Sequence, residues 1–275
     1  MTTAQKVIKY LAIAFAIFLV VSIFSGIIGT VEFIGDFFTE DTAVADMKTY
    51  PVSADIRDLT IMVNAAELQI KKGDKLSVES NLKSLSVEEK DGTLTVKDTT
   101  NVRANIFGST SYEDATLIIY VPEGTVFGNV DIFTGAGKFT VDSLSVENIE
   151  LELGAGEVKI SSLVATGSAN IEGGAGRVTI AGGALNDLNI EMGVGALDLT
   201  SALSGDSTLE MGVGKSNITL IGDREDYEID AEKGLGSIKV DGKDVSDFGS
   251  SGDGANEIEI HGGVGSINIV FKKAK

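Results

Sequence analysis

A Gly-x-Gly triplet that recurs along the chain constrains the fold more than any other feature of this sequence. Seven copies follow one another at intervals of 19, 20, 19, 19, 22 and 29 residues. Their first glycines are Gly135, Gly154, Gly174, Gly193, Gly212, Gly234 and Gly263. A repeat of this length is typical of a solenoid, in which each repeat buries its apolar face only against its neighbours.

Apolar and polar residues alternate on both sides of each triplet. Counted from the first glycine, positions −5, −3, +4 and +6 are apolar in nearly every copy, as in Ala169, Ile171, Val178 and Ile180 of the third copy. Alternation with period two predicts two short, half-buried strands. The glycines allow a bend between them because glycine tolerates positive φ. Stacked about 4.8 Å apart, the apolar positions would form internal columns.

The sequence therefore predicts an all-β fold, a single-stranded, β-helix-like β-solenoid with about 19–20 residues per coil, over residues 51–275. Less regular coils precede the first triplet, and Asp91-Gly92 predicts a tight turn. Residues 99–113 and 241–256 are expected to be excursion loops. The last strand is expected to cap the stack, with Lys272, Lys273 and Lys275 protecting its edge.

The residue that follows each first glycine is always small or aliphatic, which predicts a column that faces inward at a corner. Its members are Ala136, Ala155, Ala175, Val194, Val213, Leu235 and Val264.

One transmembrane helix is predicted ahead of the solenoid. Residues 11–31 contain no charged side chain, and at about 1.5 Å per residue this run spans a bilayer core of roughly 30 Å. Lys6 and Lys9 precede it and acidic residues follow it, so the positive-inside rule places the N-terminus in the cytoplasm. The predicted organisation is a cytoplasmic segment over residues 1–9, a helix over 10–31, a juxtamembrane tether over 32–50 and an extracytoplasmic domain over 51–275.

A cleaved signal peptide is the alternative to this anchor, because Ala43, Val44 and Ala45 resemble a small-residue cleavage site. We favour the uncleaved anchor, since the apolar run is longer than that of a signal peptide and ends well before Ala43. The expected location is the cell membrane, with a single span and the bilayer as a partner of residues 10–31.

Composition excludes several classes of function. The chain has no cysteine, one histidine and a formal net charge of −19. It therefore has no thiolate metal site or thiol nucleophile, and its acidity disfavours nucleic acid as a partner. The Gly-x-Gly triplets lack the third glycine of a dinucleotide loop, and Val158 and Val178 stand where a calcium-binding nonapeptide coil needs Asp.

The most informative polar feature is a column two residues before the first glycines, here called the glutamate ladder. It contains Glu152, Glu172, Glu191, Glu210 and Glu232, with Phe133 expected below it and His261 above. Carboxylates stacked this closely disfavour one another's ionisation unless cations attend them. Diffuse counterions on a solvated face are the simplest interpretation, and weak binding of divalent cations or a cationic polymer is the alternative. For His261 we expect an exposed residue paired with Glu232 or Glu259.

Catalysis is not expected, and neither is a cofactor. The glutamates share one repeating environment, whereas an acid/base pair needs two carboxyl groups with different surroundings. The solenoid region also has no tryptophan and few tyrosines for stacking a sugar ring.

Residues 59–270 resemble the bacterial "putative adhesin" family of β-strand-repeat domains of unknown function. The resemblance rests on TLIIYVPEGT, with its step at Pro122 and Gly124, and on rungs such as IELELGAGEVKISSL and LNIEMGVGALDLTSAL. It implies an anchored, extracytoplasmic protein and supplies no catalytic residues. The expected function is a cell-surface binding, adhesin-like or structural module that contacts an envelope protein or wall polymer. The alternative is an accessory protein of an envelope-stress sensing system that acts through partner proteins.

Overall fold

The computed structural model describes residues 41–100, 110–245, 248–251 and 254–273. The helix predicted over residues 10–31 lies outside these ranges. Within them, no helix is long and apolar enough to cross a membrane. The described chain is almost entirely β-strand, with a short 3-10 turn, η2 (Arg224–Asp226).

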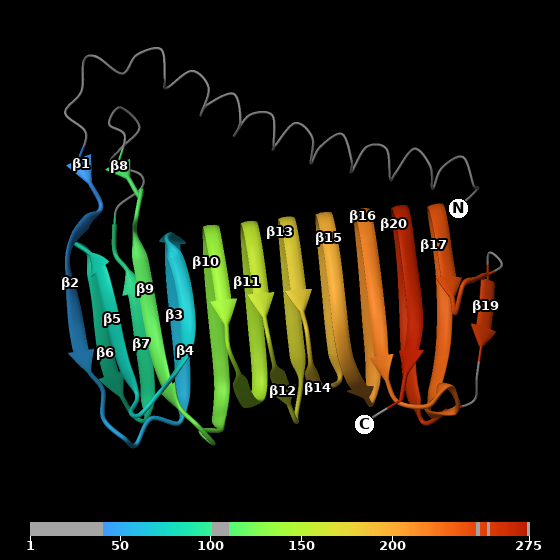
Figure 1. Ribbon diagram of the computed structural model, residues 1–275, viewed down its shortest axis with the longest axis horizontal. Coiled ribbons are helices and arrows are strands. Elements are labelled where there is room, and N and C mark those ends of the chain that lie inside the picture. Colours follow the sequence, from blue (N-terminus) through green and yellow to red (C-terminus); the bar gives the residue numbers. More distant parts are fainter. Residues whose placement is uncertain (1–40, 101–109, 246–247, 252–253, 274–275) are drawn as a thin grey trace, which may run out of the picture.

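The strands stack side by side along the long axis of the molecule (Figure 1). Their bounds are β1 (Asp41–Thr42), β2 (Val44–Pro51), β3 (Asp58–Ala65), β4 (Glu67–Gly73), β5 (Ser77–Leu82), β6 (Leu85–Lys90), β7 (Thr93–Asp98), β8 (Thr110–Ser111), β9 (Thr116–Pro122), β10 (Phe127–Val141), β11 (Leu144–Ile160), β12 (Leu163–Ala165), β13 (Ala169–Ile180), β14 (Gly183–Asn186), β15 (Leu188–Ser204), β16 (Asp206–Ile221), β17 (Tyr227–Val240), β18 (Lys243–Asp244), β19 (Phe248–Ser251) and β20 (Asn256–Lys272).

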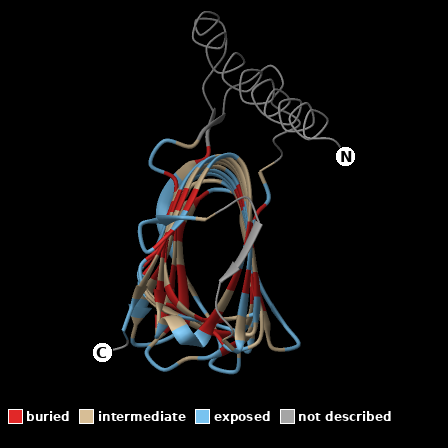
Figure 2. Ribbon diagram, turned by 90° about the vertical axis from the view of Figure 1, so that its right-hand side faces the viewer, coloured by how far each residue is buried: buried red, intermediate tan, exposed pale blue. Residues whose placement is uncertain are grey.

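The predicted β-solenoid is confirmed. Each long strand runs up one wall, bends through its Gly-x-Gly triplet and returns along a second wall, so that the coils share an arched edge when viewed along the stack (Figure 2). Short strands add part of a third side, since β12 pairs with β11 and β14. Neighbouring coils pair in parallel and in register, for example Ile171 with Ile190 and Ile190 with Leu209.

The core consists of the predicted apolar columns. Ile171 is 1% exposed, and Ile190 and Leu209 are 0% exposed, so these side chains point inward and stack on one another. The columns after the bend are also buried, including Val178 and Leu199. One continuous hydrophobic core connects the coils from Leu59 to Ile269. Because burial of apolar area is the main favourable term in folding, this core holds the coils together.

Strict alternation of buried and exposed residues is interrupted at the bend. Positions −5 and −3 are buried before the first glycine, and positions +4 and +6 are buried after it. Because −3 and +4 are an odd number of residues apart, the bend contains one residue more than strict alternation allows. The pairing between coils skips the first glycine: Leu153 pairs with Gly173 and Ala155 with Ala175, but Gly154 has no counterpart. None of the residues after the first glycines is fully buried, and Leu235 on the outer strand β17 is 47% exposed. Ala136, Ala155 and Ala175 line a small cavity at the bend beside the buried side chain of Leu153. The inward orientation of this column stays a prediction.

Close approach of backbones explains both glycines of each triplet. A Cβ on Gly154 would collide with the carbonyl oxygen of Gly135, and a Cβ on Gly195 with that of Gly176. The second glycine also has a backbone that L-residues rarely adopt, with φ of +147° at Gly195. The prediction of positive φ is therefore confirmed at the second glycine of every triplet except the sixth, Gly236, whereas the first glycine is required for space alone.

The C-terminal end of the stack is interleaved and does not follow chain order. The last strand, β20, pairs in parallel with β16 on one side and with β17 on the other. The prediction that the last strand caps the solenoid is therefore wrong. The outer position belongs to β17, which β18 and β19 partly cover as antiparallel strands drawn from the segment predicted to be a loop. Figure 1 shows this order, with β20 between β16 and β17.

The N-terminal end is interleaved in the same way. The coil formed by β3 and β4 lies between β10 on one side and β7 and β9 on the other. Antiparallel β5 and β6 then cover β9 and β7, and the predicted turn at Asp91-Gly92 joins β6 to β7. β2 pairs with β5, so the folded sheet includes residues 44–50, which the sequence had placed in the tether.

Engineered disulfides test the order of the C-terminal strands, since the chain has no cysteine of its own. Asn217 of β16 lies directly opposite Asn268 of β20, whereas Lys239 of β17 lies one strand farther away. We expect N217C/N268C to form a disulfide on mild oxidation and N217C/K239C to remain reduced, because a disulfide spans adjacent strands but not about 9.6 Å. Non-reducing mass spectrometry reads out both pairs. The opposite result would show that β16 and β17 are neighbours.

Substitution of Gly195 tests the close approach of the backbones. G195A would force neighbouring coils apart and place Ala at an unfavourable φ, so we expect the free energy of unfolding to fall by about 3 kcal/mol or more. The matched control is G182A: Gly182 has ordinary φ and its nearest neighbouring atom would be 3.5 Å from a Cβ. Urea denaturation measures both variants, and equal losses would contradict the explanation.

Candidate functional site

The glutamate ladder forms a single column on the outer face of the stack, in which Glu152, Glu172, Glu191 and Glu210 are exposed and Glu232 is half-buried. In spatial order its pairing runs through Lys97, Met62, Phe133, Glu152, Glu172, Glu191, Glu210, His261 and Glu232. The structure thus brings all five predicted glutamates together. Phe133 lies at the predicted end of the glutamates, and Met62 and Lys97 continue the column beyond it, which the repeat alone did not reveal.

His261 lies between Glu210 and Glu232, and not above the ladder as the chain order had suggested. The insertion of β20 between β16 and β17 causes this order. The Nδ1 atom of His261 is 3.7 Å from Oε2 of Glu232, and its Nε2 atom is 3.1 Å from Oε1 of Glu259. The predicted pairing of His261 with these two carboxylates is confirmed.

The centre of the ladder lacks compensating charge. Within the described residues, Glu152, Glu172 and Glu191 take part in no ion pair or hydrogen bond. The basic residues beyond the bend pair on their own wall instead: Lys138 Nζ is 3.2 Å from Glu67 Oε1 and Arg177 Nη1 is 2.8 Å from Asp198 Oδ2.

A discrete metal site is not formed by the described part of the chain, where no three His, Asp or Glu side chains converge. Weak cation binding along the ladder stays a prediction.

A groove of about 770 Å³ follows the column from Lys97 of β7 to Glu191 of β15. Its floor includes Gly135, Gly154, Gly174 and Gly193, the first glycines of four triplets. We call it the glycine groove. Its remaining lining combines the carboxylates of Glu152, Glu172 and Glu191 with apolar Met62, Phe133 and Leu153. Lys97 and Asp98 line the groove beside Met62, at the end away from the glutamates.

Asp98 is a largely buried carboxylate in this lining, 5% exposed. Its oxygens accept hydrogen bonds from Asn64 Nδ2 at 3.2 Å, from the Tyr112 hydroxyl at 3.4 Å and from the Thr100 backbone N–H at 2.9 Å. These bonds tie the start and the end of the excursion loop to β3. Burial and the nearby Asp98 charge raise the pKa of Tyr112, so this hydroxyl stays protonated and remains a donor.

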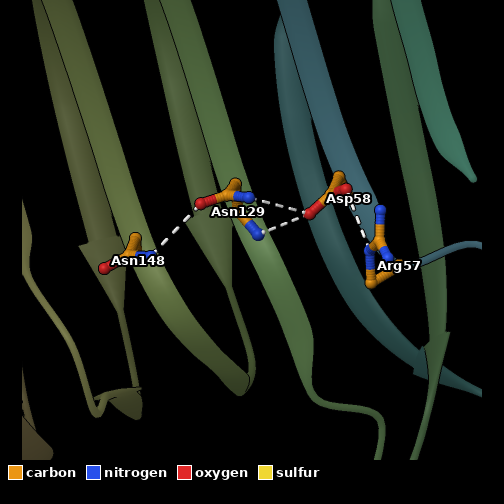
Figure 3. Close-up of polar contacts among 4 residues, drawn as sticks. All are labelled: Arg57, Asp58, Asn129 and Asn148. Carbon is orange, nitrogen blue, oxygen red and sulfur yellow. Dashed lines mark hydrogen bonds and ion pairs between the residues drawn. The ribbon is translucent and has the colours of Figure 1, made fainter.

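A second polar ladder runs along a corner between coils and was missed by the sequence analysis. It links Asp58, Asn129, Asn148 and Ser168 across successive coils: Asn129 donates to Asp58 Oδ1 from its backbone N at 2.8 Å and its Nδ2 at 3.0 Å. Asn148 Nδ2 donates to Asn129 Oδ1 at 3.2 Å (Figure 3), and Ser168 N donates to Asn148 at 3.1 Å. Asn at position −6 in two successive repeats was the available signal.

Hydrogen bonds and burial shift the pKa values of two carboxyl groups at this corner, those of Asp58 and Asp131. The backbone N–H of Asn129 is the main cause that holds the pKa of Asp58 below its ordinary value, with help from the Asn129 side chain and Arg57. Burial raises the pKa of the nearby Asp131, and the Asp58 charge adds to this. Asp58 therefore stabilises the fold as a carboxylate, whereas Asp131 opposes it when ionised.

The stabilising effect of Asp58 should depend on pH. Because the folded-state pKa is lowered, its contribution is complete at neutral pH and is lost as the pH falls through that value. We expect D58N to be less stable than the parent protein by about 1 kcal/mol near pH 7. The difference should close as the pH falls below the ordinary range of an aspartate carboxyl group. Urea denaturation across this range measures it, with D74N on an exposed turn as the control. A difference independent of pH would contradict this assignment.

Comparisons with known proteins identify relatives of this domain. The family model described as Toastrack DUF4097 matches residues 56–269. Among solved structures, a "putative cell adhesion protein" from Clostridium sporogenes is 17% identical, with 82% of this chain and 99% of that chain covered and a TM-score of 0.34. A "putative adhesin" from Bacteroides fragilis is 14% identical, with 83% and 99% covered and a TM-score of 0.38. No curated protein matches the sequence.

Proposed function

This chain belongs to the Toastrack DUF4097 family, and on that premise we propose that it is a membrane-anchored, non-catalytic binding module on the outer side of the cell membrane. The observation that carries the proposal is the in-register stacking of coils from β3 to β17, which converts single residues into ladders along an exposed face. A surface of this kind offers the same chemistry repeatedly along its length. It suits an elongated partner better than a small substrate.

Membrane anchoring is part of this proposal and is supported by the sequence. Residues 11–31 carry no charge, and lysines precede them. Nine residues, 32–40, separate this run from β1. Fully extended they reach about 30 Å, so the domain would remain close to the bilayer.

The similar surroundings of the ladder carboxylates support a binding function and not a catalytic one. Glu152, Glu172 and Glu191 occupy equivalent, exposed positions on successive coils. Nothing in this arrangement would make one of them an acid and its neighbour a base.

The accessory role in an envelope-stress sensing system is favoured by one specific observation. β8, at the end of the first excursion, pairs in parallel with β1, where the described chain begins: Asp41 lies opposite Thr110 and Thr42 opposite Ser111. If residues 11–31 cross the membrane, the paired strands β1 and β8 would lie near the bilayer, where a neighbouring membrane protein could contact them. In this version the partner is a protein and not a wall polymer.

Crosslinking in intact bacterial cells tests the proposed function. A photo-reactive amino acid is placed at exposed Glu113, beside β8, and in a second variant at exposed Glu210 on the ladder. We expect the protein to remain membrane-bound and to retain residues 1–45. If it has the accessory role, the crosslinker at Glu113 should capture one partner protein in stoichiometric amount. Recovery of wall polymer from Glu210 would instead favour adhesion. A mature chain that begins after Ala45 would remove the anchor, and failure to recover any partner would contradict the binding function.

A further inference from the structure

The glycine groove combines apolar and acidic lining in a fixed order along the stack. Phe133 and Met62 are paired neighbours at one end, and Glu152, Glu172 and Glu191 follow on successive coils. A ligand that lies along the groove would therefore meet an aromatic and a thioether side chain first and then three carboxylates about 4.8 Å apart.

Charge complementarity selects the occupant. The three carboxylates have no partner among the described residues, so they repel an anionic lipid surface, a phosphate or a second copy of this chain, whose net charge is −19. They attract cationic groups. Lys97, which follows Met62 in the column, places a positive charge at the other end of the groove, next to the hydrogen-bonded Asp98. Basic groups are consequently directed to the glutamates, and an uncharged group to Met62 and Phe133.

We propose that the glycine groove binds an extended, basic peptide segment, with two or three Lys or Arg side chains over Glu152, Glu172 and Glu191 and an apolar side chain beside Phe133. The exposed glycine backbone on the floor lets the peptide main chain approach closely. The groove volume of about 770 Å³ is within the range of sites that hold small ligands or short peptide segments. This inference deepens the proposed binding function and rests on it.

Synthetic peptides test the inference directly. The probe is an acetylated, amidated tetrapeptide with three lysines followed by phenylalanine, and the reference peptide carries glycine in place of phenylalanine. Isothermal titration calorimetry at low salt is performed on the full chain in nanodiscs of zwitterionic lipid, with empty nanodiscs as the blank. We expect the phenylalanine peptide to bind more tightly than the glycine peptide, and both to weaken as salt is added.

Variants with matched charge locate the site. E152Q/E172Q/E191Q should weaken binding of both peptides roughly tenfold, since three ion pairs are lost. The control E147Q/E150Q/E257Q removes the same number of charges from exposed positions outside the groove, and it should leave affinity within about twofold. F133S should abolish the preference for the phenylalanine peptide while leaving the glycine peptide unaffected. Circular dichroism melting confirms that each variant is folded.

Several outcomes would overturn the inference. They are the absence of binding, an equal loss in the control variant, and binding of spermine as tightly as the phenylalanine peptide, which would indicate diffuse attraction of cations alone. If crosslinking in cells still recovers a partner while the peptides fail, the binding function stands and only the basic-peptide site is wrong.

Discussion

The structure depends on the close approach of parallel backbones at the Gly-x-Gly bend. Each coil crosses the arch so near to its neighbour that a Cβ on Gly154 or Gly195 would occupy the position of a carbonyl oxygen. Because both glycines are small enough, the two walls of every coil remain in register with those of the next. The aliphatic columns can then stack without gaps, and burial of these columns supplies the favourable free energy of folding.

The same bend creates the surface on which the proposed function rests. Gly135, Gly154, Gly174 and Gly193, where a Cβ would collide with the neighbouring coils, line the groove beside the ladder. The glycines that the fold requires therefore also expose a strip of backbone along the groove. Since register is strict, the carboxylates next to this strip have a fixed spacing and could select a ligand by the order of its charged and apolar groups.

Antiparallel strands at both ends cover the strand edges that a solenoid otherwise exposes, and the coils beneath them are interleaved. A sequential stack would end in an open rung at each end. Here β20 is held between β16 and β17, and β3 with β4 is held between β10 and the β7 and β9 coil. Antiparallel strands then cover the outer coils. Sequence periodicity carried only an indirect sign of this, in the intervals of 22 and 29 residues before the last two triplets.

The coil, its buried columns and the glutamate ladder are encoded in the local sequence pattern. These follow from the alternation of residues such as Ile171 and Glu172, because period two assigns side chains to faces whatever their neighbours are. Tertiary structure alone decided which coils are adjacent, and therefore that His261 separates Glu210 from Glu232 and that Met62 and Lys97 continue the column. Equivalent repeats can pair in more than one order with similar local energetics. The choice among these orders depends on long-range burial and edge covering, which no local pattern encodes.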